Sequence, residues 1–396
     1  MLKKYSEKST FFIFKYILSK KMQAKKLKEV ALVFFKLGCF AFGGPAAHIA
    51  MMEVEVVTKR KWMTRDYFLD LIGTTNLIPG PNSTEMTMHC GYERAGKTGL
   101  FVAGIAFIIP ATLITAVLAY LYVKYGTLPQ VEPFVFGIKP AVLAIIASAV
   151  LKLGKKAVKT IELTIIGILV LTASLLGVNE VVALLSAGVL GMLYFYFKGK
   201  ARGSLNGFSP LLLSSTLGFT LTKITALNVF WVFLKVGAIL YGSGYVLFAY
   251  LDAELVTRGW LTRVELIDAI AVGQFTPGPV LSTSTFIGYQ LSGFPGALAA
   301  TSGIFLPSFL FVLILNPFIP KMRNSKLLRY FLDAVNVAAV AVMLAVLIVM
   351  TKETVLGWKA VVIALGGALL VFKTKISPIW VIIIGSISGY ILLEFL

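Results

Sequence analysis

The residues best suited to binding chemistry are two Pro-Gly-Pro triplets, Pro79-Gly80-Pro81 and Pro277-Gly278-Pro279, in matched surroundings about 198 residues apart. Proline lacks a backbone N–H and fixes φ, and glycine accepts the conformation needed between two prolines. A helix starting at the second proline directs its free N–H groups and positive dipole end back at the triplet. Two such starts meeting inside the protein would bind an anion. The alternative is a structural kink packed by small residues.

Polar residues beside the triplets would add donors to such a site. Asn76 and Gln274 are equivalent in the two repeats, and further candidates are Asn82, Ser83, Thr84, Thr276, Ser282 and Thr283. Lys36 and Lys235 also occupy equivalent positions, inside apolar segments. A lysine at the centre of a membrane helix costs about 3 kcal/mol on insertion scales. Either the two cations face the anion, or they snorkel to the interface.

Two glycine-rich breaks, Gly43-Gly44-Pro45 and Gly242-Ser243-Gly244, form a second matched pair. They either face the triplets across a cavity or permit close helix packing.

Several acids are candidates for coupling or gating. Glu85 follows the first triplet, and Thr283 is its counterpart. It either couples anion movement to protons, or reaches an aqueous vestibule or a lysine. Equivalent acids earlier in each half either act as gates, or line a vestibule and pair with nearby basic residues; they are Glu53, Glu55, Asp252 and Glu254.

Composition defines the environment in which these residues act. Hydrophobic residues make up 58% and charged residues 14% of the chain, against about 25% charged in soluble domains. The apolar runs do not alternate, so a helical membrane bundle is expected rather than a β-barrel. The net charge of +19 lies mainly in breaks between apolar runs, which favours a topological role over nucleic-acid binding. Two cysteines predict no disulfide framework, and we expect neither a metal site nor a cofactor.

The matched motifs divide the chain into two repeats. We predict a basic extension at 1–28, repeats at 29–198 and 225–396, and a linker at 199–224. The segments around each triplet have 11 to 13 residues, too few for the roughly 20 that a crossing needs. They predict re-entrant half-helices at 66–78, 82–93, 265–275 and 280–291. Full crossings and terminal hairpins follow at 99–123, 134–151, 161–177, 181–197, 296–318, 331–350, 360–372 and 378–396.

Basic breaks at 152–159 and 321–329 lie one crossing apart in their repeats. If both are cytoplasmic, the repeats are inverted. This inverted orientation requires an additional crossing near the linker, around 211–221, so that an odd number of crossings separates equivalent elements.

Taken together, these residues resemble the chromate ion transporter family. The matching strings, which cover both halves, are Phe42-Gly43-Gly44-Pro45-Ala46-Ala47-His48-Ile49, Gly273-Gln274-Phe275-Thr276-Pro277-Gly278-Pro279-Val280 and Gly303-Ile304-Phe305-Leu306-Pro307-Ser308-Phe309. The resemblance implies a multi-pass protein of the inner membrane that exports chromate, with sulfate as a competing or exchanged oxyanion. Ser243 departs from the longer glycine run usual in the family, and Asn82 and Glu85 point to a different ligand set in the first half.

A proton or a counter-anion is the expected coupling partner, and a homodimer is left open. A passive anion channel and a transporter of a different anion are the alternatives. An enzyme is not expected, because His48 and His89 have no counterparts in the second half and no Walker loop is present.

Overall fold

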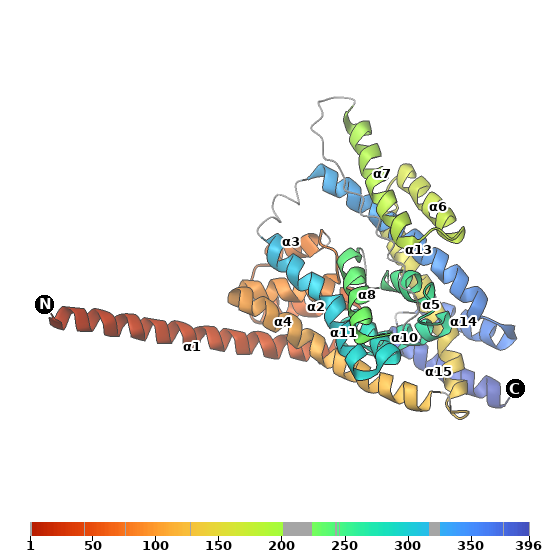
Figure 1. Cartoon of the computed structure of the whole chain (residues 1–396), viewed down its shortest axis with the longest axis horizontal. Helices are drawn as coiled ribbons and strands as arrows, with labels where there is room; N and C mark the ends of the chain where they lie inside the picture. The colour runs from red at the N-terminus through yellow and green to blue at the C-terminus, as the bar shows by residue number, and fades with distance from the viewer. Residues whose placement is uncertain are drawn as a thin grey trace.

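The computed structural model describes residues 2–42, 44–75, 77–126, 128–200, 224–241, 244, 246–316, 325–374 and 376–395. These residues form helices and connecting segments, without strands among them. The first half contains α1 (Leu2–Phe40), α2 (Pro45–Met52), the π-helical segment η1 (Glu53–Lys59), α3 (Arg65–Thr75), α4 (Asn82–Tyr125), α5 (Glu132–Ala157), α6 (Ile161–Leu175) and α7 (Glu180–Lys200). Residues 2–28 of the predicted N-terminal extension form the first part of α1, which projects from the bundle (Figure 1).

The second half repeats this order of elements. It contains α8 (Ala226–Ile239), α9 (Leu247–Leu251), the π-helical η2 (Asp252–Val256), α10 (Arg263–Phe275), the 3-10 turn η3 (Val280–Ser282), α11 (Thr283–Leu315), α13 (Lys326–Thr354), α14 (Gly357–Lys373) and α15 (Pro378–Glu394). Among the described residues, five helices are long and apolar enough to cross a membrane: α4, α5, α7, α11 with η3, and α13. An all-α membrane protein with two homologous halves is thus confirmed.

Both triplets lie between short helical arms, as the segment lengths predict. Before the triplets, α3 has 11 residues and α10 has 13, too few to cross a bilayer. After the triplets, α4 is broken at Ala95 and Gly96, and α11 is broken at Ser292 and Gly293. The two breaking glycines have φ of +68° and +60°, which L-residues rarely adopt. Each break therefore separates a short second arm from a membrane-length helix.

Local capping explains where the first arms begin. The Thr262 hydroxyl accepts a hydrogen bond from the Glu265 N–H, and the Glu265 carboxylate accepts one from the Thr262 N–H. This capping box satisfies two otherwise unpaired donors at the start of α10. In the first half, the Thr64 hydroxyl accepts from the Tyr67 N–H at 3.3 Å, but Tyr67 cannot complete the box.

The two halves interlock. The helix α5 packs against α14 and α15 of the second half, while its counterpart α13 packs against α6 and α7 of the first. Glycines permit this close approach: a side chain at Gly137 would collide with the α15 backbone at Gly385 and Gly389. Each repeat is therefore continuous in sequence, but α5 and α13 each pack against helices of the opposite repeat. Their inverted orientation stays a prediction, and the segment around 211–221 lies outside the described residues.

Candidate functional site

Each Pro-Gly-Pro triplet reaches across to the opposite half. The Gly80 N–H donates a hydrogen bond to the Leu240 carbonyl at 2.6 Å, and the Gly278 N–H donates one to the Ala41 carbonyl at 2.9 Å. Leu240 follows α8 and Ala41 follows α1, so each triplet contacts the segment just before a glycine-rich break. Both glycine N–H groups are engaged in this conformation. An anion at the triplets must use other donors or open these two crossed bonds.

Glycine is required at the centre of both triplets. Gly80 has φ of +141° and Gly278 has φ of +86°. A Cβ atom on Gly278 would lie 3.0 Å from the Ala111 Cβ and 3.1 Å from the Gly38 oxygen. A Cβ atom on Gly80 would collide with the Glu85 carboxyl and with the Ser308 hydroxyl. Each triplet is therefore enclosed by the long helix of the opposite half, because Ser308 lies on α11 and Ala111 on α4.

The helices that leave the triplets begin without side-chain caps. Pro81 precedes α4 and Pro279 precedes η3, and neither start receives a side-chain hydrogen bond at its cap position. Their first-turn N–H groups are thus the donors that an anion would meet. Ser83 and Ser282 lie buried in these first turns, and the Ser282 hydroxyl has no hydrogen-bond partner among the described residues.

The other predicted donors have mixed placements. Gln274 and Thr276 are buried just before the second triplet. The Thr276 hydroxyl donates to the Val272 carbonyl at 2.7 Å and lies 3.5 Å from the Thr115 hydroxyl of the first half. Asn82 opens α4 and is partly exposed, whereas Asn76 lies outside the described residues.

The structure describes one glycine of each glycine-rich break, Gly44 and Gly244. Gly44 has φ of +79° and precedes Pro45, the first residue of α2. Gly244 lies against the turn after the second triplet, since a Cβ there would be 3.5 Å from the Val280 Cβ. Gly43, Gly242 and Ser243 lie outside the described residues. Gly244 thus lies beside the second triplet, and Gly44 lies three residues after Ala41, whose carbonyl accepts the Gly278 N–H.

The two lysines of the apolar segments lie on exposed sides of their helices. The Lys235 ammonium lies 2.5 Å from a Glu254 carboxylate oxygen, and Arg258 binds the other oxygen at 2.7 Å. Glu254 is buried, so Lys235 is neutralised in this conformation rather than being free to face an anion. The equivalent Lys36 is exposed.

The predicted gating acids form repeat-equivalent ion pairs. Glu53 pairs with Arg65 at 2.9 Å, and the equivalent Asp252 pairs with Arg263, also at 2.9 Å. Arg263 additionally pairs with Glu353 on α13 at 2.6 Å.

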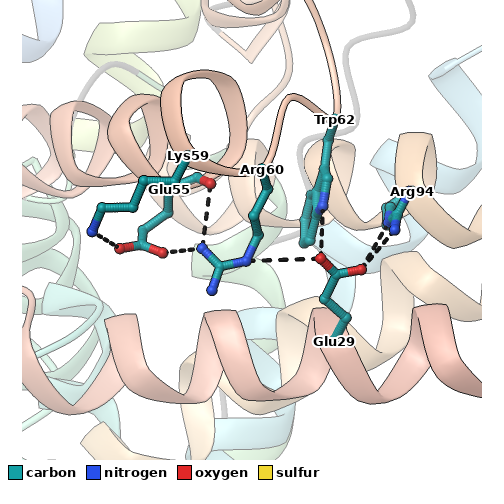
Figure 2. A network of polar contacts seen from close by, with 6 residues as sticks. All are labelled: Glu29, Glu55, Lys59, Arg60, Trp62 and Arg94. Atoms are coloured by element: carbon teal, nitrogen blue, oxygen red, sulfur yellow. Dashed lines mark hydrogen bonds and ion pairs between the residues drawn. The ribbon is translucent and has the colours of Figure 1, made fainter.

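A wider polar network surrounds Glu55 in the first half (Figure 2). Glu55 contacts Lys59 at 2.7 Å and also pairs with Arg60. Hydrogen bonds from Lys59, followed by those from Arg60, hold the pKa of Glu55 below its usual value. Arg60 links Glu55 to Glu29, which also binds Arg94 at 2.7 Å and accepts a hydrogen bond from the Trp62 indole at 3.2 Å. The network joins α1, η1 and α4.

Sequence reasoning missed several of these partners. Ser308 follows a helix-interior proline and its counterpart is Ala111, a difference visible only once the repeats are aligned. The Leu240 and Ala41 carbonyls carry no sequence signal, since any residue supplies a carbonyl. Within the described residues, no group of three or more His, Cys, Asp or Glu side chains could hold a metal ion.

Two interlocked halves of apolar helices, each broken at a buried Pro-Gly-Pro triplet, define a multi-pass membrane protein of the transporter type. The model of the chromate transporter family matches residues 28–192 and 227–390. The chain therefore belongs to that family, and like its bacterial members it is expected in the cytoplasmic membrane.

Curated relatives resemble the chain over most of its length. It is 32% identical to the chromate transport protein of Cupriavidus metallidurans, over 88% of each chain. It is 31% identical to the probable chromate transport protein of Synechococcus elongatus, over 93% of this chain and 96% of that protein. An uncharacterised transporter of Methanocaldococcus jannaschii is 26% identical over 92% of this chain and 94% of its own. No solved structure matches significantly.

Proposed function

We propose that the protein is a secondary transporter that exports chromate, or a related tetrahedral oxyanion such as sulfate, by alternating access. The observation that carries this proposal is the matched placement of the two triplets against the opposite halves. Each is followed by an uncapped helix start, and each donates a backbone hydrogen bond to the opposite half. Helix N-termini at a repeat interface are suited to anions.

The crossed hydrogen bonds suggest how the site opens. In the closed arrangement the Leu240 and Ala41 carbonyls occupy the N–H groups of Gly80 and Gly278. An oxyanion can replace a carbonyl at each of these donors without leaving an N–H unpaired. Separation of one triplet from its carbonyl would then open one side of the site while the other stays closed.

The donor set predicts weak discrimination between chromate and sulfate. Both are tetrahedral dianions, and the nearby groups are backbone N–H groups, hydroxyls and the Gln274 amide. Such a site discriminates between anions by their size and charge, but not by their central atom. A passive anion channel is the competing function, because two re-entrant hairpins also suit a gated pore.

The test is chromate uptake into everted membrane vesicles, with and without an imposed proton gradient and with added sulfate. We expect uptake above that of vesicles lacking the protein, dependence on the gradient, and a reduction by excess sulfate. Uptake that merely follows the chromate gradient would favour the channel. Absence of uptake with folded protein present would reject chromate as the substrate, and undiminished uptake in excess sulfate would reject the weak-discrimination argument.

A further inference from the structure

One buried acid at the first triplet has no charge partner. Glu85 lies in the first turn of α4 and is fully buried. Its N–H donates to the Pro81 carbonyl at 3.0 Å, which fixes it directly after the triplet. Neither carboxyl oxygen forms a hydrogen bond of standard geometry or an ion pair with a described residue. The carboxyl and the Ser308 hydroxyl both border the space beside Gly80.

The groups around Glu85 do not compensate a negative charge. The Tyr241 phenol, just after α8, is close enough to interact with it electrostatically. His89 lies one turn further along α4, and its imidazole interacts with Asn316 at the end of α11.

Charged and titratable groups from other elements reach α4 elsewhere. They are Glu29 of α1 at Arg94, Tyr67 of α3 at Glu93, Asp268 of α10 at Tyr122, and His48 of α2 against Phe107.

An ionised carboxylate buried without a cation or several donors is strongly disfavoured. The arrangement seen here therefore suits a neutral carboxyl, which donates one O–H and keeps acceptor capacity for the Ser308 hydroxyl. When the triplet separates from α8 and water enters, the same group can ionise. Protonation of Glu85 is thus linked to whether the hairpin is closed or open.

We propose that Glu85 binds a proton that moves together with the anion, a proposal that rests on the proposed function. The carboxyl lies beside the Gly80 backbone, next to the donors that an oxyanion would use. A carboxylate there would repel a dianion, whereas a neutral carboxyl would not. Proton and anion therefore bind in the same state and cross in the same direction.

This coupling remains compatible with export. A dianion that leaves with one proton carries a net charge of −1. A membrane potential that is negative inside the cell drives this charge outward.

The experiment uses the full-length protein in liposomes that contain a pH-sensitive dye. Chromate is the probe, at mildly alkaline pH where it is a dianion. An inward chromate gradient should acidify the interior with the wild-type protein. Glu85→Gln, which mimics the neutral acid permanently, should reduce this acidification to the level of protein-free liposomes. Exchange of labelled chromate across the membrane should persist in this variant, because exchange requires no release of the proton.

A matched control and a second variant complete the design. Glu93→Gln makes the same change on the same helix at an exposed carboxylate that binds the Tyr67 hydroxyl, and it should acidify like the wild type. Glu85→Asp keeps a titratable group and should retain part of the acidification. Absence of chromate exchange in the wild type would instead reject the proposed function. With exchange intact, the proton proposal is overturned if the wild type makes the interior alkaline, or if Glu85→Gln acidifies normally.

Discussion

Substitution of Gly278 by alanine tests whether the crossed contact between the halves is required for transport. An alanine would have to adopt φ near +86° and place its Cβ 3.0 Å from the Ala111 Cβ and 3.1 Å from the Gly38 oxygen. The left-handed conformation alone costs about 1–2 kcal/mol for an L-residue. Overpacking adds about 1–3 kcal/mol. The closed triplet should therefore lose about 2–5 kcal/mol relative to conformations in which it has moved away.

Two other glycines separate these contributions. Gly96→Ala introduces a similar left-handed strain, with φ of +68°, but its Cβ would meet nothing within 4 Å. It should therefore cost about 1–2 kcal/mol. Gly73→Ala lies within α3, has open space and needs no unusual φ, so it should stabilise the helix by about 0.5–1 kcal/mol.

The assays are vesicle uptake of chromate and thermal unfolding in detergent, measured on the same preparations. We expect Gly278→Ala to insert into the membrane but to lose transport, whereas Gly96→Ala and Gly73→Ala retain it. The unfolding temperature should fall most for Gly278→Ala and should not fall for Gly73→Ala. Wild-type transport and stability in Gly278→Ala would refute the argument that this contact is tight and necessary.

Two further comparisons exploit repeat-equivalent residues. Arg263→Ala leaves the buried Asp252 without its cation and should cost about 3 kcal/mol or more. Arg65→Ala removes an exposed arginine from the partly exposed Glu53 and should cost less than about 1 kcal/mol. Thermal unfolding can measure both losses. Equal losses would contradict the burial argument. Lys235→Ala breaks the ion pair with buried Glu254 and should lower stability, whereas Lys36→Ala should not. Chromate uptake in both variants tests whether either lysine contributes to anion binding. Normal uptake in both would reject that role.

Much of the fold followed from features that depend on sequence spacing. The arms around Pro79-Gly80-Pro81 and Pro277-Gly278-Pro279 are too short to cross, and the structure ends them close to the predicted positions. The breaks at Gly96 and Gly293 fall in the short gaps between the half-helices expected to end at 93 and 291 and the crossings expected to begin at 99 and 296. Periodicity and helix-breaking residues are local properties, so one chain is sufficient to reveal them.

The partners of the triplets could not be predicted in the same way. The exchange of helices between halves, such as α5 against α15, depends on long-range packing of small residues such as Gly137. The acceptors for Gly80 and Gly278 are backbone carbonyls, which no side-chain pattern marks. Lys235 illustrates the converse case. Its repeat position suggested an anion ligand, but Glu254 binds it in the structure. The two residues are far enough apart in sequence that their spacing does not predict this contact.

The differences between the halves carry more functional information than the similarities. Both halves share the triplet, the broken helix and the acid–arginine pair, so these features are sufficient for a symmetric scaffold. At the triplets this symmetry fails. Glu85 at the first triplet and Ser308 of the second half border the same space beside Gly80, while Thr283 after the second triplet and Ala111 of the first half occupy the equivalent positions. Two equivalent carboxyls would place two protons, or two negative charges, beside one dianion. Under the proposed coupling, a single carboxyl would make one hairpin sensitive to protons and leave the other to respond to the anion alone.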